Sequence, residues 1–269
     1  MNLAAELAVA LDIARRVAAE LRTAYERFEP IADAPAEIST DADRDAQELI
    51  LRALHESFPR DRLIAEEETQ TLLHSPSEAE RCWIVDPIDG TRGFAMKNGE
   101  FSSMIGLAVN GEVVLGVVVE PIIERRTYAT RGDGCWVIRC ESAPERCRVS
   151  RVDSLSESQL TLSHATPGRP RKAADILMPK STIETFSAGI KLALVARGEA
   201  DIYVNTYSGF HDWDVCAGEI LVAEAGGAVA ELSGLPIRYA QRAKPPRSGF
   251  VASNGLLHDA ALERWRNRS

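Results

Sequence analysis

The sequence contains few cysteines, no membrane-length apolar run and no excess of positive charge, and each shortage excludes a class of protein. Its five cysteines form no C-x-x-C pair, which argues against a disulfide scaffold or a cysteine zinc site and favours a reduced, cytoplasmic protein. The apolar stretch 1–21 is interrupted by charged residues at helical spacing. It therefore predicts an amphipathic helix, not a signal peptide or a membrane span.

The charge balance restricts the partners further. Forty acidic residues against 31 basic ones give a formal net charge of -9, which argues against a nucleic-acid polymer or an anionic membrane as the main partner. A small phosphate ester is compatible with this charge, because bound cations make the local field positive. The sequence also lacks a P-loop, a G-x-G-x-x-G turn and a G-x-S-x-G nucleophile elbow.

One segment, 83–94, combines acidic residues with a sharp turn. An apolar run that predicts a buried strand ends at Val85 and is followed by Asp86 and Asp89, then by a glycine and a threonine at an expected helix start. Two carboxylates that converge at such a turn favour a hard divalent cation. The N–H groups of Gly90, Thr91 and Arg92 are expected to bind a phosphate. The alternative is a simple Asp-Gly turn capped by the threonine.

Three separated motifs in this order resemble the inositol monophosphatase superfamily. The first is D-P-I-D-G-T at 86–91, and it is preceded by an acidic pair at Glu66-Glu67 and followed by W-D-x-x-A-G at 213–218. The resemblance implies an α+β fold, a layered αβαβα sandwich. It also implies a Mg²⁺-dependent phosphatase that uses two or three ions, which Mn²⁺ can replace, and it is compatible with a homodimer.

The resemblance also assigns roles to individual residues. The implied ligands of the ions are Glu66, Asp86, the carbonyl of Ile88, Asp89 and Asp214. Thr91, backed by Asp43, would orient the attacking water, with Glu66 also close to the reaction. Simpler explanations exist: Asp43 and Asp214 could cap helices, and the run that starts at Glu66 could be a solvated surface. A protein of this fold could also be a metal-dependent regulatory scaffold.

The prediction of the substrate depends on segments outside the three motifs. The segment 91–101 is similar to the bacterial 3'(2'),5'-bisphosphate nucleotidases, and Ser187 and Lys191 resemble their S-x-x-K pattern. A second phosphate would then meet Lys191 or Arg92, with His211 on the substrate side or serving only as a structural hydrogen-bond partner. The best interpretation is hydrolysis of 3'-phosphoadenosine 5'-phosphate to AMP. Inositol 1-phosphate and histidinol phosphate remain alternatives.

The chain is expected to form two halves, 1–145 and 146–269, separated by polar, proline-containing sequence. The first half is predicted to contain helices and an antiparallel meander, and the second to alternate strands and helices. The elements expected within them are helices over 1–21, after residue 40, over 187–197, over 213–225 and through 265, a loop over 70–79, a meander over 101–139 with a hairpin turn at Asn110-Gly111, and a last strand over 250–253.

Overall fold

The computed structural model describes residues 1–269 except 36–37, 165–171, 208, 242–248 and 269. Its helices are α1 (Ala4–Arg27), α2 (Asp41–Ser57), α3 (Gln70–Leu73), α4 (Thr91–Ala95), α5 (Lys172–Leu177), α6 (Ala188–Ala196), α7 (Cys216–Glu224) and α8 (His258–Arg268), with the 3-10 turn η1 (Leu155–Glu157). No helix in these ranges is long and apolar enough to cross a membrane.

The first half of the chain forms a seven-stranded sheet in simple sequence order. Only β1 and β2 are parallel, and every later neighbour is antiparallel. At the turn between β3 and β4, Asn110 and Gly111 both have positive φ angles, which confirms the predicted hairpin. The strands are β1 (Arg62–Ala65), β2 (Arg81–Asp89), β3 (Ser102–Val109), β4 (Glu112–Glu120), β5 (Arg125–Thr130), β6 (Gly134–Arg139) and β7 (Glu145–Arg146).

The second half forms a mixed five-stranded sheet in the order β11-β12-β10-β8-β9. Strand β8 is parallel to both β9 and β10, whereas β12 is antiparallel to its two neighbours. The strands are β8 (Gln159–Leu162), β9 (Ser181–Glu184), β10 (Ile202–Asn205), β11 (Ala228–Glu231) and β12 (Phe250–Ser253).

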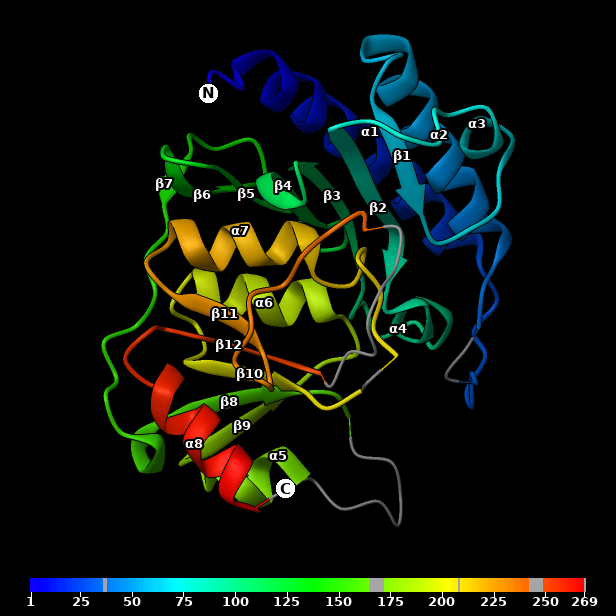
Figure 1. The fold of residues 1–269 in the computed structure, drawn as a ribbon. Coiled ribbons are helices and arrows are strands. Elements are labelled where there is room, and N and C mark those ends of the chain that lie inside the picture. Colours follow the sequence, from blue (N-terminus) through cyan, green and yellow to red (C-terminus); the bar gives the residue numbers. More distant parts are fainter. Residues whose placement is uncertain (36–37, 165–171, 208, 242–248, 269) are drawn as a thin grey trace.

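Five layers result, as predicted (Figure 1). Helices α1 and α2 cover the outer face of the seven-stranded sheet, α6 and α7 lie between the two sheets, and α5 and α8 cover the far face of the five-stranded sheet. The apolar stripe of α1, from Ala10 to Leu21, is buried against the sheet. Burial of this stripe explains why the apolar N-terminal sequence needs no membrane.

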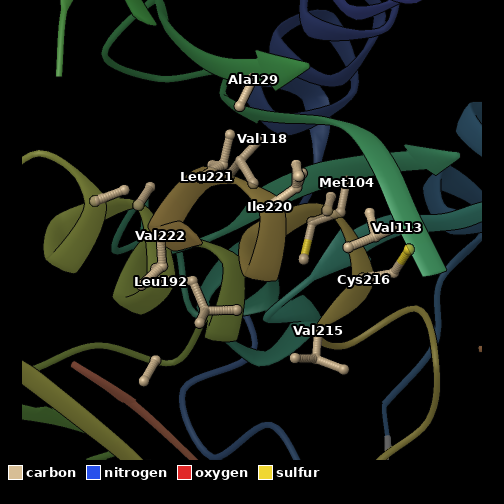
Figure 2. Packing of buried hydrophobic residues seen from close by; sticks show 14 of the residues in the cluster. Met104, Val113, Val118, Ala129, Leu192, Val215, Cys216, Ile220, Leu221 and Val222 are labelled. Atoms are coloured by element: carbon tan, nitrogen blue, oxygen red, sulfur yellow. The ribbon is translucent and has the colours of Figure 1, made fainter. Parts of the chain in front are cut away.

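The middle layer packs closely on the first sheet, and Leu192 of α6 and Ile220 of α7 belong to the same buried cluster as Met104 and Val118 (Figure 2). A side chain at Gly116 of β4 would place its Cβ 2.3 Å from the carbonyl oxygen of Ala217. The glycine therefore permits the backbone of α7 to approach the sheet. Both halves of the chain contribute to this shared core.

Three expectations about individual elements were wrong in detail. The segment expected to be a loop over 70–79 begins with the helical turn α3, and α7 begins at Cys216, three residues later than expected. The boundary placed between 145 and 146 falls inside β7, the edge strand of the first sheet. The chain crosses to the second sheet only over 147–158. The polar sequence around Pro144 resembled a linker, but β7 still pairs with β6 there.

Candidate active site

Asp86 and Asp89 reach one end of the first sheet because β2 carries them there. The pairing of β2 with β3 is irregular between these two residues, where the chain contains Pro87, which has no N–H to donate. Gly90 then turns the chain with a φ of +88°, and a Cβ there would lie 2.8 Å from the carbonyl oxygen of Glu100. Helix α4 starts at Thr91, as expected.

The structure places Thr91 and Asp43 in direct contact. The Thr91 hydroxyl lies 3.0 Å from Asp43 Oδ1 and 2.9 Å from the carbonyl oxygen of Ile88. The other oxygen of Asp43 accepts hydrogen bonds from the backbone N–H and the hydroxyl of Thr40. Asp43 therefore fulfils both interpretations of its sequence: it secures the start of α2 and it holds the threonine of the motif.

Gln47 is a site residue that the sequence analysis missed. It is fully buried, it donates to the carbonyl oxygen of Glu67 at 2.5 Å, and it accepts from the Glu67 N–H at 2.8 Å. These bonds fix the segment that carries Glu66. The available signal was its spacing, because Gln47 follows Asp43 by four residues and so lies on the same face of α2.

The carboxylates of the site repel one another. Burial, followed by repulsion from Glu66, Asp89 and Asp214, raises the pKa of Asp86 well above its usual value. Although Glu66 is exposed as a residue, loss of solvent around its carboxyl group and repulsion from Asp214 and Asp43 raise its pKa to about 8. Asp86 Oδ1 is buried and has no hydrogen-bond partner among the residues that the structure describes. Such a cluster favours either protons or a bound cation.

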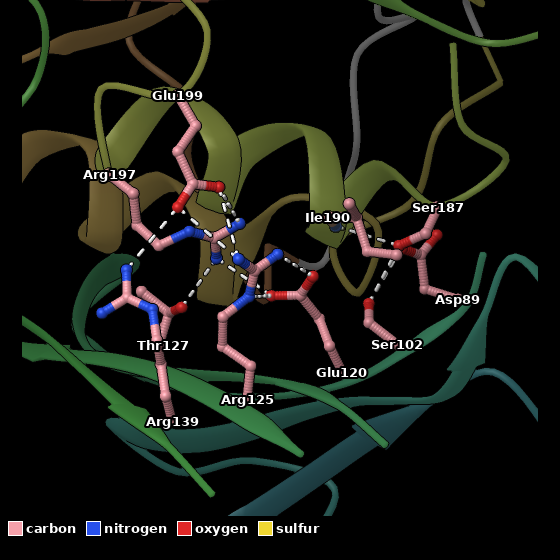
Figure 3. A network of polar contacts seen from close by, with 10 residues as sticks. All are labelled: Asp89, Ser102, Glu120, Arg125, Thr127, Arg139, Ser187, Ile190, Arg197 and Glu199. Carbon is pink, nitrogen blue, oxygen red and sulfur yellow. Dashed lines mark hydrogen bonds and ion pairs between the residues drawn. The ribbon is translucent and has the colours of Figure 1, made fainter. Parts of the chain in front are cut away.

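Asp89 differs from Asp86 because protein donors surround both of its oxygens. Its Oδ1 accepts from the Ala188 N–H at 3.1 Å, and its Oδ2 accepts from the Gly189 N–H at 2.6 Å and from the hydroxyls of Ser187 and Ser102 (Figure 3). Asp89 thus caps α6, a helix of the second half of the chain. A carboxylate at this end of a helix is favoured by the helix dipole.

Ser187 is therefore placed differently from its expected substrate-binding role. It is fully buried and is the N-cap residue of α6, where its hydroxyl accepts the Ile190 N–H at 2.9 Å. The same hydroxyl donates to Asp89 and contacts Ser102 at 2.9 Å. These contacts make Ser187 a positioning residue for Asp89.

Lys191 does not extend into the site, which corrects the expectation that it binds a second phosphate. The side chain is 1% exposed, and its ammonium group donates to Ser163 Oγ and to the carbonyl oxygens of Thr185 and Phe186 at 2.9 to 3.2 Å. Burial lowers the pKa of Lys191 to about 8, against the opposite effect of nearby carboxylates. All three N–H donors of the group are used within the protein.

Asp214 lies just before α7 but does not cap it. The N-cap residue of α7 is Val215, whose apolar side chain makes no cap hydrogen bond. The Asp214 carboxylate instead accepts the His211 N–H at 2.6 Å, while the His211 ring stacks on Trp213 at 4.3 Å. Repulsion between Asp214 and both Glu66 and Asp86 shows that Asp214 belongs to the acidic cluster.

Arg92 has a half-buried guanidinium group beside the cluster. The group lies 5.2 Å from the ring centre of Phe186, and its Nε is buried with no hydrogen-bond partner. His164 packs on the same ring at 4.4 Å and contacts Glu100 through Nε2 at 2.5 Å. Within the described ranges Arg92 forms no ion pair, which leaves its charge available to an anion.

The donor set fits hard divalent cations. Carboxylate and carbonyl oxygens are the ligands that Mg²⁺ and Mn²⁺ prefer, and Asp86 offers an oxygen without another partner. However, no three acidic, histidine or cysteine side chains of the described residues are close enough together to hold an ion as they stand. Binding therefore requires side chains such as Asp214, which now accepts a backbone N–H, to turn toward the ion.

Two sheets within three helical layers, with an unneutralised carboxylate cluster beside a threonine–aspartate pair, define the class of metal-dependent phosphatases. The chain belongs to the inositol monophosphatase family, whose sequence model matches residues 2–268. This match confirms the resemblance found in the motifs. The chain is accordingly a phosphatase, of a family that is generally Mg²⁺-dependent.

The similar proteins have different substrates in their names. The chain is 31% identical over 265 residues to the histidinol-phosphatase of Mycobacterium tuberculosis, covering 96% of this chain and 97% of that protein. It is 32% identical over 228 residues to the fructose-1,6-bisphosphatase/inositol-1-monophosphatase of Thermotoga maritima, with 84% and 82% covered. It is 27% identical over 256 residues to the 3'(2'),5'-bisphosphate nucleotidase CysQ of Aggregatibacter actinomycetemcomitans, with 93% and 92% covered.

A solved structure confirms the architecture. The IMPase of Thermotoga maritima superimposes with a TM-score of 0.81 at 30% sequence identity and covers 97% of each chain. The αβαβα arrangement predicted from the motifs is therefore shared with a solved member of the family.

Proposed function

We propose that the protein hydrolyses the phosphomonoester of a small phosphorylated metabolite, and that water attacks the phosphorus directly. The observation that carries this proposal is the contact between Thr91 and Asp43 beside Asp86, whose Oδ1 has no protein partner. Bound Mg²⁺ ions would lower the pKa of the attacking water and stabilise the leaving oxygen. Glu66, Asp86, Asp89, Asp214 and the carbonyl of Ile88 would hold them.

The remaining chemistry belongs to the chain itself. Because the Thr91 hydroxyl donates toward Asp43 and Ile88, its lone pairs are directed to other donors and can accept a hydrogen bond from the attacking water. This contact would orient the water for attack. The first N–H groups of α4, including those of Thr91 and Arg92, have no partner within the helix and would hold the phosphoryl oxygens.

The preferred substrate carries a second anionic group, of the type found in 3'-phosphoadenosine 5'-phosphate. Support comes from Arg92, whose charge has no carboxylate partner in the described part of the chain, and from Phe186, which offers a ring face beside it. A charge-assisted contact to phosphate contributes about 1.5–3 kcal/mol. Since Lys191 is buried, this role falls to Arg92 alone.

Histidinol phosphate is the second candidate. Two observations favour it: the 31% identity to a histidinol-phosphatase across nearly the whole chain, and the carboxylates of Glu100 and Glu184 close to His164. Carboxylates at this place would suit a substrate with a cationic amine rather than a second phosphate. The bisphosphate therefore requires positive protein charge at this part of the site, whereas histidinol phosphate requires negative charge there.

A phosphate-release panel distinguishes them. The wild type, Arg92→Ala and the surface control Arg60→Ala would be assayed with Mg²⁺ on 3'-phosphoadenosine 5'-phosphate, 3'-AMP, histidinol phosphate and inositol 1-phosphate. We expect Arg92→Ala to lower kcat/KM for the bisphosphate by roughly 10–150-fold more than for 3'-AMP, which lacks the second phosphate. Equal losses of kcat/KM on both nucleotides would exclude Arg92 as the residue that binds the second phosphate. A wild-type preference for histidinol phosphate would select the second candidate.

A further inference from the structure

Two buried cysteines lie opposite each other at the edge of the seven-stranded sheet. Cys135 is in β6, and Cys147 directly follows β7. The pairing of Trp136 with Arg146 places the two cysteines at the next position of the same register, and the Cys147 N–H donates to the Cys135 carbonyl oxygen at 2.8 Å. Hydrogen-bonded antiparallel residues have Cα atoms about 5.5 Å apart, within the span of a disulfide.

The two side chains also meet. The two thiols lie close enough to alter each other's pKa, and both residues are at most 5% exposed. Interaction with Cys135, together with the nearby guanidinium groups of Arg197 and Arg139, lowers the pKa of Cys147, while interaction with Cys147 and burial raise the pKa of Cys135. Because the thiolate is the nucleophile, Cys147 is the attacking group and Cys135 the resolving group.

We propose that Cys135 and Cys147 form a reversible disulfide when the protein meets a hydroperoxide. The Cys147 thiolate attacks one oxygen of hydrogen peroxide, the O–O bond breaks, and the hydroxide that leaves takes up a proton to become water. The sulfur of Cys135 then attacks the resulting sulfenic acid, forms the S–S bond and releases a second water. Two thiols are oxidised and one peroxide is reduced to two waters.

The position of the pair predicts what the disulfide changes. Cys147 starts the crossing to the second sheet, where the Val149 N–H bonds to the carbonyl oxygen of Ala225 at the end of α7. A Cβ at Gly198, just after α6, would lie 2.8 Å from the carbonyl oxygen of Arg148. The crossing is thus packed against the C-terminal ends of both middle helices. The disulfide would fix it there, at the end of α6 opposite to Asp89.

The other three cysteines provide internal comparisons. Cys82 and Cys216 are buried in the core, and Cys140 is exposed. The experiment therefore uses the full chain with Cys140→Ser, which prevents disulfides between molecules, and compares it with the same chain carrying Cys135→Ser. Each would be treated with hydrogen peroxide and then mapped by mass spectrometry of unreduced peptides.

We expect one intramolecular disulfide, between the peptides of Cys135 and Cys147, with a mass loss of about two hydrogens that dithiothreitol reverses. The melting temperature should rise by on the order of 5 °C, because the bond closes a short loop of the unfolded chain. Phosphatase turnover should change less than twofold. The chain with Cys135→Ser should show neither the crosslink nor the rise in melting temperature.

Other results would overturn the proposal. Oxidation of Cys147 to a sulfinic acid without a crosslink would show that Cys135 does not resolve it. A disulfide that involves Cys82 or Cys216 would show that the pairing of β6 with β7 does not determine which cysteines react. Since the peptide map is made on a chain that keeps both cysteines, a folding defect of the serine variant cannot obscure these outcomes.

Discussion

The two ends of α6 use carboxylates in opposite ways. At its C-terminal end, Glu120 and Glu199 are paired with three arginines: Arg197 contacts both acids at 2.9 to 3.0 Å, Arg125 contacts Glu120 at 2.7 Å, and Arg139 contacts Glu199 at 3.7 Å (Figure 3). At its N-terminal end, Asp89 meets hydroxyl and N–H donors, and the acids around it face one another. Arginines neutralise the acids at the C-terminal end of α6, whereas the acids at its N-terminal end repel one another.

The pKa shifts follow this difference. Burial acts against ionisation at Glu199, yet hydrogen bonds from Arg197 and attraction by Arg125 and Arg139 lower its pKa below the usual value. At Asp86 burial and repulsion act in the same direction and raise the pKa. Paired acids at one end stabilise the fold, whereas the mutually repelling acids at the other end would provide charge for an ion. The arrangement also suits the helix dipole, with acid at the N-terminus and arginine at the C-terminus.

The largest expected effect is a loss of turnover when an acid at the N-terminal end of α6 is replaced. Asp86→Asn should lower kcat by on the order of 10³-fold, because a ligand charge that supports several kcal/mol of transition-state stabilisation is lost. Its melting temperature in EDTA should not fall, since the change removes repulsion and Oδ1 has no partner to lose. Phosphate release and thermal unfolding would measure both.

Asp89→Asn is the matched comparison for that variant. Its amide nitrogen would face an N–H or hydroxyl donor in either orientation, so it should lose stability by about 1–3 kcal/mol as well as turnover. Full stability of Asp89→Asn, or a clear loss in Asp86→Asn, would contradict the assignment of Asp89 as the cap of α6.

The next effect concerns Thr91, whose hydroxyl contacts Asp43. Thr91→Ala should lower kcat by roughly 10²–10³-fold with little change in Mg²⁺ affinity, because the hydroxyl positions water and is not a ligand. Thr91→Ser, which retains the hydroxyl, should restore most of the rate. Titrations of turnover with Mg²⁺ would measure kcat and Mg²⁺ affinity separately. An equal loss of kcat in Thr91→Ser would argue against water positioning by the hydroxyl.

At the paired end the expected effect is on stability alone. Glu120→Gln should cost about 3 kcal/mol of unfolding free energy, because it leaves Arg125 and Arg197 buried with only Glu199 to neutralise them. Turnover below the melting temperature should stay within a few-fold of the wild type. Glu112→Gln, which removes two exposed ion pairs, should leave stability almost unchanged because solvent screens both pairs. Urea unfolding would compare the two variants.

The smallest effect is the pH dependence of the metal-free protein. Glu66 has a pKa of about 8 in the folded state and a value near 4.5 when unfolded, so the folded state binds more protons between these values. The melting temperature in EDTA should therefore fall by a few degrees as the pH rises from about 5 to 8. Saturating Mg²⁺ should remove this slope. A melting temperature that rises over this range in EDTA would refute the repulsive cluster.

The sequence by itself determined the class of the protein and much of its organisation. The motif at 86–91 identified the family, the helical spacing of 1–21 predicted α1, and Asn110-Gly111 predicted the turn between β3 and β4. These features depend on residues close together in the chain, so residue type and spacing are enough to predict them. Asp43 beside Thr91 was also predicted, but only through the resemblance.

Only the tertiary structure decided what each polar residue contacts. The S-x-x-K resemblance could not show that Lys191 is enclosed by carbonyl oxygens, nor that Ser187 holds Asp89 from 98 positions away. The expected helix at 213 made capping the simpler explanation for Asp214, but α7 begins only at Cys216 and the carboxylate accepts the His211 N–H. Such contacts join residues far apart in the chain, and hydrogen bonding and charge depend on which groups the fold brings within about 3 Å.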